Sequence, residues 1–249
     1  MKIKSFGSSS AGNAYILDDG ASVLLIECGF TFKNLTRKIR EADYTVSQLA
    51  GVLISHEHHD HAECWCKLVD YGLKVYASHG TISALAKQDG NLAKLIVPLA
   101  PDPGRDMSGP VQIGSFDVMA FRTFHDAAEP IGFLIRSRHE GTKVVFATDT
   151  VNLAYRFPGV NILMLEANYA EDLIPKGRLP ESVVKRIRNT HMELRRLCEY
   201  LQTLDLTHCR EIYLMHLSDS SSNEFLFHKA VKAVVPDHVR VYIFGKNGK

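Results

Sequence analysis

The run His56-Glu57-His58-His59-Asp60-His61 gathers four histidines and an aspartate within six residues. Imidazole and carboxylate groups are the ligands that zinc and manganese take in proteins. His56 and His58 lie two residues apart in an extended stretch, so their rings leave the chain on the same side. Asp60 and His61 follow after the chain turns and can face a second ion. The run therefore predicts a metal site, and its spacing allows two ions.

One run cannot complete two sites, because a catalytic ion takes about three protein ligands and keeps one position open. Three further residues of ligand type follow β-prone stretches, namely His125, Asp149 and His216. A lone His or Asp in such a place is more often a surface, core or turn residue. The histidine run favours the metal interpretation, because it directly follows the apolar stretch 49–54, which is typical of a strand buried on both faces.

Strand and helix patterns alternate along the chain and position these residues at strand ends. Strands are expected at 3–6, 14–17, 22–27, 49–54, 74–77, within 111–122, and at 131–136, 143–147, 161–165, 211–215 and 239–244. Helices are expected at 32–43, 80–87, 179–204 and 223–234. No linker or repeat interrupts the chain. We therefore expect one α+β domain over residues 1–249, with two facing sheets covered by helices.

Composition places few limits on function. The chain has 249 residues, 45% of them hydrophobic, and a net charge of +1, which argues neither for nor against a nucleic-acid partner. Five scattered cysteines do not form a disulfide framework, and the pair Cys64 and Cys66 is a weak zinc signal that we interpret as ordinary thiols. Without a signal-peptide pattern or a membrane-length apolar run, we expect a cytoplasmic protein with no membrane partner. The oligomeric state stays open.

The ordered motifs resemble those of the metallo-β-lactamase superfamily. The run from His56 to His61 matches its H-x-H-x-D-H signature, and His125, Asp149 and His216 match its later metal-binding motifs in order. Residues 7–15 look like its first hairpin, and Leu25-Ile26-Glu27-Cys28-Gly29 resembles its Asp-Cys-Gly turn with Glu as the acid.

The resemblance implies a four-layer αββα sandwich and a site for two divalent metal ions, Zn or Mn, with Fe as a further option. Three residues would bind the first ion, namely His56, His58 and His125. The second ion would be bound by Asp60, His61 and His216, and Asp149 would bridge the two. Two ions about 3.5–4 Å apart can share a hydroxide, which supplies a nucleophile for hydrolysis at neutral pH.

Two further resemblances bear on the substrate. Glu166-Ala167-Asn168 and Thr190-His191-Met192 are similar to elements of the transfer-RNA 3′-processing branch, in which a Glu orients a His that protonates the leaving oxygen. Met192 replaces that branch's small hydroxyl residue. The opening Gly-Ser-Ser-x-x-Gly-Asn and His216-Leu217-Ser218 resemble the YycJ/WalJ-like group of predicted exonucleases, although residues 219–222 lengthen the stretch before Asn223.

We therefore expect a phosphodiesterase or nuclease acting on DNA or RNA, with Asp60, Glu166 and His191 in its catalytic machinery. The alternatives are a lactone, thioester or small-ester hydrolase on the same scaffold and a non-catalytic metal-binding regulatory protein. For Glu166 the alternative is a structural role, and for His191 the start of a helix. If residues 179–204 form one helix, Lys185, Arg188 and Arg195 share a face that could bind a phosphate backbone. Because acidic residues interleave with these cations, we favour a solvated helix face.

Overall fold

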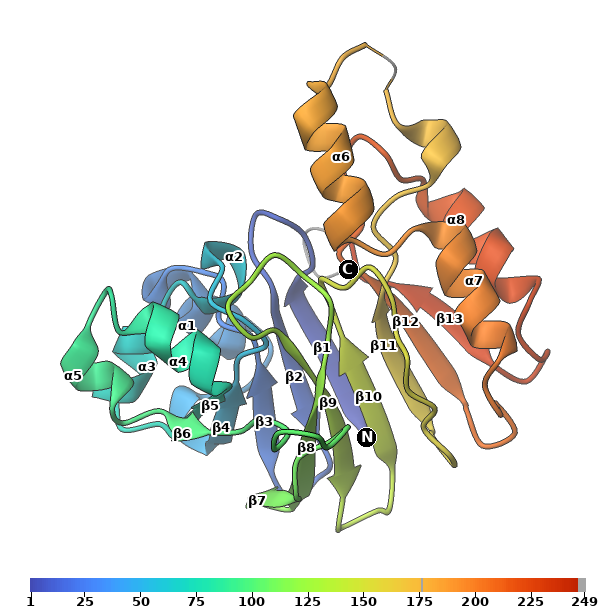
Figure 1. Ribbon diagram of the computed structural model, residues 1–249. Helices are drawn as coiled ribbons and strands as arrows, with labels where there is room; N and C mark the ends of the chain where they lie inside the picture. Colours follow the sequence, from blue (N-terminus) through green and yellow to red (C-terminus); the bar gives the residue numbers. More distant parts are fainter. Residues whose placement is uncertain (176, 246–249) are drawn as a thin grey trace.

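A computed structural model describes residues 1–175 and 177–245 and contains two β-sheets that face each other (Figure 1). The first sheet has the order β1-β2-β3-β4-β5-β6, and its strands are β1 (Lys2–Gly7), β2 (Ala14–Asp18), β3 (Val23–Ile26), β4 (Leu49–Leu53), β5 (Val75–Ala77) and β6 (Val97–Pro98). Strands β1 to β3 are antiparallel, whereas β3 to β6 run parallel. As the sequence predicts, Asp18-Asp19-Gly20 turns the hairpin between β2 and β3.

The second sheet has the order β13-β12-β11-β10-β9-β8-β7. Its strands are β7 (Val111–Ile113), β8 (Phe116–Arg122), β9 (Ile131–Ser137), β10 (Lys143–Ala147), β11 (Ile162–Glu166), β12 (Glu211–Met215) and β13 (Arg240–Ile243). Strands β7 to β10 are antiparallel, and β10 to β13 are parallel. Parallel strands end at the same edge of a sheet, so the carboxyl ends of β10, β11 and β12 lie together.

Eight helices accompany the sheets in the described chain, and most of them cover the outer face of one sheet or the other (Figure 1). They are α1 (Phe32–Glu41), α2 (His59–Ala62), α3 (Trp65–Asp70), α4 (His79–Leu85), α5 (Gly90–Ala93), α6 (Glu181–Thr190), α7 (Leu194–Gln202) and α8 (Glu224–Lys232), with 3₁₀ turns at Val46–Gln48 and Glu171–Leu173. No helix within the described residues is long and apolar enough to cross a membrane.

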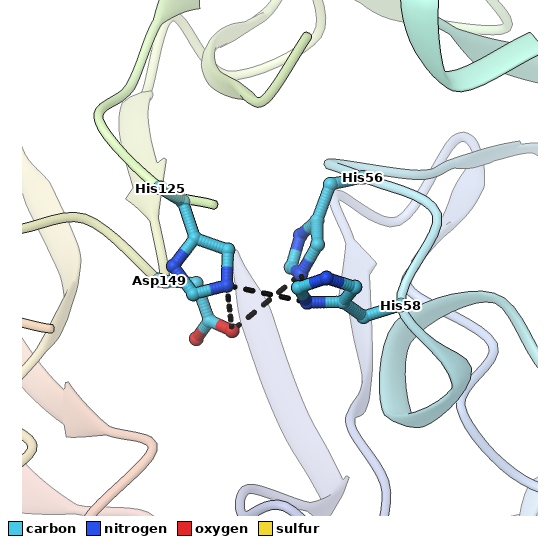
Figure 2. A group of neighbouring side chains, drawn as sticks. All are labelled: His56, His58, His125 and Asp149. Carbon is cyan, nitrogen blue, oxygen red and sulfur yellow. Dashed lines mark hydrogen bonds and ion pairs between the residues drawn. The ribbon is translucent and has the colours of Figure 1, made fainter. Parts of the chain in front are cut away.

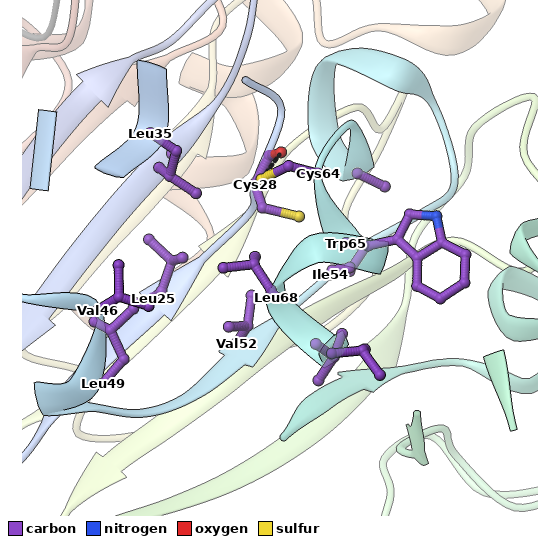
Figure 3. Packing of buried hydrophobic residues seen from close by; sticks show 14 of the residues in the cluster. Leu25, Cys28, Leu35, Val46, Leu49, Val52, Ile54, Cys64, Trp65 and Leu68 are labelled. Atoms are coloured by element: carbon purple, nitrogen blue, oxygen red, sulfur yellow. Dashed lines mark hydrogen bonds between the residues drawn. The ribbon is translucent and has the colours of Figure 1, made fainter. Parts of the chain in front are cut away.

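Three buried hydrophobic clusters separate four layers. One joins the first sheet to α1 and α3, with Leu35, Trp65 and Leu68 fully buried against strand residues such as Leu25 (Figure 3). A second lies between the two sheets, and a third joins the second sheet to α7 and α8. Three apolar interfaces require four layers, which confirms the predicted αββα sandwich.

The helical pattern at 179–204 is not one helix. α6 ends at Thr190, His191 is extended (φ −127°, ψ 156°), and α7 begins after Glu193, whose side chain accepts a hydrogen bond from the Arg196 backbone at 3.0 Å. The backbone N–H of Met192 donates instead to Glu166 Oε2 at 3.1 Å. The predicted continuous face of Lys185, Arg188 and Arg195 is therefore wrong, because these contacts with the end of β11 interrupt the helix.

α6 differs from the other long helices in its surroundings. It projects beyond the sheets (Figure 1), and Thr190 is its only buried residue among those described. Such a helix has little apolar packing to stabilise it. Its carboxyl end reaches the edge at which β8, β10, β11 and β12 terminate.

Candidate metal centre

Four side chains from three separate segments point at one another at this edge (Figure 2). They are His56 and His58, which follow β4, His125, which follows β8, and Asp149, which follows β10. His58 Nδ1 lies 3.1 Å from His56 Nε2 and 3.2 Å from His125 Nε2. Asp149 Oδ2 lies 3.5 Å from the Nε2 atoms of both His56 and His125. Ligands about 2.0–2.1 Å from a tetrahedral metal are about 3.3–3.4 Å apart, so the four atoms fit one ion.

Contacts behind two of these rings select the nitrogen that faces the centre. His125 Nδ1 lies 2.9 Å from the backbone carbonyl oxygen of Thr190, to which it must donate its proton. His56 Nδ1 lies 2.9 Å from Ser55 Oγ. Because Nδ1 is occupied in each ring, Nε2 remains for the centre, an arrangement common around metal-binding histidines.

A second group consists of Asp60, His61, Asp149 and His216. Asp60 Oδ2 lies 3.4 Å from His61 Nε2 and 3.5 Å from His216 Nε2. His216 Nε2 is buried and has no hydrogen-bond partner among the described residues. A buried polar atom left unpaired costs about 1–3 kcal/mol. A cation between these side chains removes that cost, so this group also fits a metal ion.

Asp149 belongs to both groups. Its Oδ2 atom lies 3.5 Å from His56 Nε2 in the first group and 3.2 Å from His61 Nε2 in the second. The side chain is 4% exposed, and its Oδ1 accepts a hydrogen bond from Thr148 Oγ1 at 3.0 Å. One carboxylate oxygen is therefore placed between two sets of nitrogens, as a bridging ligand would be.

Glu166 and His191 form a pair beside the second group. His191 Nδ1 donates to Glu166 Oε1 at 2.6 Å, and the same oxygen lies 3.3 Å from His216 Nδ1. Glu166 Oε2 accepts from the backbone N–H groups of Thr150 at 2.9 Å and Met192 at 3.1 Å. Burial alone would raise the pKa of Glu166, but the charge and hydrogen bond of His191 outweigh it and lower that pKa. The contact of its Oε1 with His191 Nδ1 places the Glu166 carboxylate where it can orient the ring.

The buried carboxylates also control the charge of the rings. Burial raises the pKa of Asp149, but the imidazoles of His216 and His61 outweigh it and hold that pKa well below its usual range. Burial lowers the pKa of His216, but Asp149, Asp60 and Glu166 outweigh it and raise the pKa to about 10. The polypeptide itself therefore attracts positive charge to this place.

The sequence analysis gave no supporting role to three residues that brace these groups. Asn13 Nδ2 donates to the backbone oxygen of Asp60 at 3.1 Å, and Asn168 Nδ2 donates to the backbone oxygen of His216 at 2.8 Å. Glu27 is fully buried, and its Oε2 lies 3.6 Å from His61 Nδ1. Asn13 and Asn168 stand within the motifs that carry the resemblance, but their contacts reach across about 50 residues of chain and have no local signal.

Three residues of the centre adopt a left-handed backbone conformation, namely Glu27 (φ 64°), Asp149 (φ 47°) and His216 (φ 53°). Each comes within two residues of the end of a parallel strand. This region is uncommon outside glycine and costs about 1–3 kcal/mol where the surroundings impose it. The three turns direct their side chains into the site.

All nine residues named from the sequence lie together, in the two groups above and in a third that joins Asp149, Glu166, His191 and His216. Within the described chain, the five cysteines are free thiols and none belongs to a metal-binding group. Cys28 and Cys64 pack in the hydrophobic core of the first sheet (Figure 3), and the backbone N–H of Cys28 donates to the backbone oxygen of His61 at 2.7 Å. The roles of the nine residues stay predictions.

The family described as "Beta-lactamase superfamily domain" matches residues 23–217, which is most of the chain. The chain belongs to this superfamily. The match spans the histidine run, His125, Asp149, Glu166, His191 and His216, so every residue of the candidate centre except Asn13 falls inside it. As a member of the β-lactamase superfamily with groups able to hold metal, the chain is a metal-dependent hydrolase.

Two curated relatives cover nearly the whole chain. The chain is 27% identical over 244 residues to exodeoxyribonuclease YycJ of Bacillus anthracis, covering 92% of this chain and 87% of that protein. It is 25% identical over 241 residues to exodeoxyribonuclease WalJ of Streptococcus pneumoniae, covering 92% of this chain and 86% of that protein. The predicted resemblance to the YycJ/WalJ-like group is confirmed.

The chain is also similar to solved structures. One is the metallo-β-lactamase fold protein YhfI of Bacillus subtilis, which is 20% identical with a TM-score of 0.71. The match covers 99% of this chain and 96% of that one. The short form of human tRNase Z gives a TM-score of 0.66 with 15% identity, and covers 99% of this chain and 96% of that one. At these identities the likeness shows the fold alone, which is the metallo-β-lactamase fold.

Proposed function

We propose that the chain is a dinuclear metal-dependent phosphodiesterase that cleaves nucleic acid, with DNA as the first substrate to test. The observation that carries the proposal is the Glu166–His191 pair beside the shared carboxylate of Asp149. An alkoxide leaving group has a high pKa and needs an acid to protonate it, whereas a lactone or thioester does not. The exodeoxyribonuclease names of the two relatives support DNA.

The proposed roles follow from the contacts. His56, His58 and His125 would bind one ion, Asp60, His61 and His216 the other, and Asp149 would bridge them. Two divalent cations, for which nitrogen and oxygen ligands suit zinc or manganese, would supply Lewis acidity and a bound water of lowered pKa. His61 and Asp60 are held for this task by Glu27 and Asn13.

His191 would act as the general acid. Its Nδ1 proton is engaged by Glu166, so Nε2 is the nitrogen that can hold a proton for the leaving oxygen. Burial lowers the pKa of His191, but the Glu166 carboxylate outweighs it and raises that pKa, which favours the protonated acid near neutral pH. Thr190, the preceding residue, binds His125 through its carbonyl, so one segment fixes both the acid and a ligand.

The test compares wild type with His191→Ala on single- and double-stranded DNA and RNA with added Mn²⁺ or Zn²⁺. We expect a loss of about 10²–10⁴ in turnover with unchanged metal content, because the ligand groups remain intact. Asp60→Ala controls for contaminating nuclease. An unchanged rate in His191→Ala, or hydrolysis of lactones and thioesters with none of phosphodiesters, would contradict the proposal. Two bound metals without any hydrolysis would indicate the non-catalytic alternative.

A further inference from the structure

The mouth of the metal centre carries an ion pair outside the ligand groups. Asp126 directly follows His125, and Arg186 lies on α6, the helix that ends next to His191. Arg186 Nε donates to Asp126 Oδ2 at 2.6 Å, and Arg186 Nη2 donates to Asp126 Oδ1 at 3.3 Å. Asp126 Oδ1 in turn lies 3.2 Å from His125 Nε2, the atom that faces the first group. Asp126 therefore links the Arg186 guanidinium to His125, a candidate metal ligand.

The contacts around Arg186 hold it in this position. Thr190 Oγ1 donates to the backbone oxygen of Arg186 at 2.8 Å, and the Thr190 carbonyl accepts from His125 Nδ1 at 2.9 Å. On the other side, Glu57 Oε1 accepts from the Ala128 backbone at 2.8 Å and so restrains the loop that carries Asp126. The last turn of α6 and the loop after β8 are thus fastened to each other and to the histidine run.

The guanidinium still has donors to offer. Asp126 occupies the edge formed by Nε and Nη2, and no described residue accepts a hydrogen bond from Nη1. The side chain is 56% exposed. A guanidinium held along one edge presents the other as a fixed pair of N–H donors, a geometry that suits phosphate oxygens.

The acidic side chains of the centre explain why a cation such as Arg186 is useful to an anionic substrate. The Asp126 hydrogen bond raises the pKa of Arg186 most, and the charges of Asp126, Asp149 and Asp60 raise it further. Asp60, Asp149 and Glu166 would repel an anionic substrate that approached the polypeptide alone. Two cations of the predicted face are engaged elsewhere, since Arg188 pairs with Glu171 and Arg195 with Glu199.

We propose that Arg186 binds the phosphate of the substrate at the mouth of the metal centre, and that Asp126 is the positioning residue that holds its guanidinium there. The inference rests on the proposed function, because it gives the phosphodiesterase its selectivity for an anionic over a neutral ester. It assigns this selectivity to α6, the helix that projects beyond the sheets.

The test uses the full chain loaded with Mn²⁺ and has two separate readouts. The first is the affinity for inorganic phosphate, measured by calorimetry, and the second is KM and kcat for bis-p-nitrophenyl phosphate. The variants are Arg186→Gln, which keeps a hydrogen bond to Asp126 without the charge, Arg186→Lys, which keeps the charge without the fork, and Asp126→Asn. Arg188→Ala is the matched control, because residues two apart on a helix do not share a face. Metal content and thermal stability are measured for each variant.

We expect Arg186→Gln to weaken phosphate binding by about tenfold or more and to raise KM more than it lowers kcat. Arg186→Lys should bind phosphate more tightly than Arg186→Gln does, and Asp126→Asn should lose less affinity than Arg186→Gln. Arg188→Ala should bind phosphate as wild type does. The inference is overturned if the phosphate affinity and the KM of Arg186→Gln stay within about twofold of the wild-type values. It is also overturned if the wild-type protein binds no phosphate. If phosphate binding depends on Arg186 but no diester is hydrolysed, the proposed function is wrong and the phosphate site is supported. If diester hydrolysis is unchanged in Arg186→Gln, the phosphate site is wrong and the proposed function is supported.

Discussion

His191 Nδ1 lies 2.6 Å from Glu166 Oε1, which joins the end of α6 to the end of β11 across 25 residues of chain. The pair is almost fully enclosed, with the Glu166 side chain 0% and the His191 side chain 13% exposed. An ion pair so placed favours one orientation of the ring, because burial strengthens the interaction and leaves the ring little contact with water.

Removing the charge of Glu166 should shift the pH profile of turnover. The carboxylate raises the pKa of His191 above the value that burial would give it. In Glu166→Gln that pKa falls, so the protonated acid is lost at lower pH and the alkaline limb of the kcat profile moves to lower pH. We also expect kcat at neutral pH to drop by about 10- to 100-fold. The measurement is kcat against pH on an oligodeoxynucleotide, and an unmoved alkaline limb would show that Glu166 does not act through His191.

Loss of the shared carboxylate should affect both metal groups. Asp149→Ala removes an atom from both of the groups proposed to hold an ion, whereas His216→Ala leaves the group of His56, His58, His125 and Asp149 intact. We expect His216→Ala to retain about one equivalent of tightly bound metal and Asp149→Ala to retain less, because each site needs about three ligands. Metal content after dialysis against a chelator measures this. Equal stoichiometry in the two variants would argue against a bridging role.

Glu27 should set metal affinity without binding metal. Its carboxylate lies 3.6 Å from His61 Nδ1, where it orients the ring that faces Asp60 and Asp149. Outer carboxylates of this kind contribute about 10- to 100-fold in metal affinity. Competition with a coloured chelator should show that loss in Glu27→Gln. Glu41→Gln, at an exposed carboxylate paired with Arg37, serves as the control and should bind metal as wild type does.

Asp19 should stabilise the contact between the sheets at neutral pH. Its Oδ2 accepts hydrogen bonds from Ser115 Oγ and Ser137 Oγ, both at 2.7 Å, which tie the β2–β3 hairpin to the second sheet. Burial alone would raise the pKa of Asp19, but these bonds outweigh it and lower that pKa. A lowered pKa means that the stabilisation is complete above the unfolded value near 4 and is lost as pH falls through the folded value.

Asp19→Asn should therefore lower the free energy of unfolding by about 1–3 kcal/mol at pH 7. The gap between variant and wild type should close in acid below about pH 4. Urea unfolding at several pH values measures both effects. A gap that stays constant down to the acid range would contradict the role given to the ionised carboxylate.

Gly29 should resist substitution because the chain passes close to it. A Cβ atom at this position would lie 1.7 Å from the backbone oxygen of Asp60, a contact that only movement of the histidine run can relieve. We expect Gly29→Ala to lose metal binding and stability together, measured by metal content and thermal unfolding. Gly90→Ala is the matched control, since a Cβ there meets nothing within 4 Å. Equal behaviour of the two variants would contradict the steric argument.

The sequence by itself determined the donors of the centre and their order along the chain. His125, Asp149 and His216 each follow a β-prone stretch that becomes a strand of the second sheet, and strands running in the same direction bring their carboxyl ends to one edge. His56 follows β4 of the first sheet, so it reaches that edge because the two sheets face each other. The alternation of strand and helix patterns predicted two facing sheets covered by helices, since hydrophobic periodicity is a local signal. The resemblance to the superfamily implied the four-layer order αββα.

Only the tertiary structure decided where the helical pattern at 179–204 is interrupted and which turns become left-handed. It also decided which charged side chains pair with each other. Helical spacing favours continuity through His191, yet Glu166 takes the backbone N–H of Met192 and the ring of His191. The conformations of Glu27, Asp149 and His216, and the contact of Arg186 with Asp126, likewise depend on partners distant in sequence. Local propensity is worth fractions of a kcal/mol per residue, and buried contacts between distant segments outweigh it at the site.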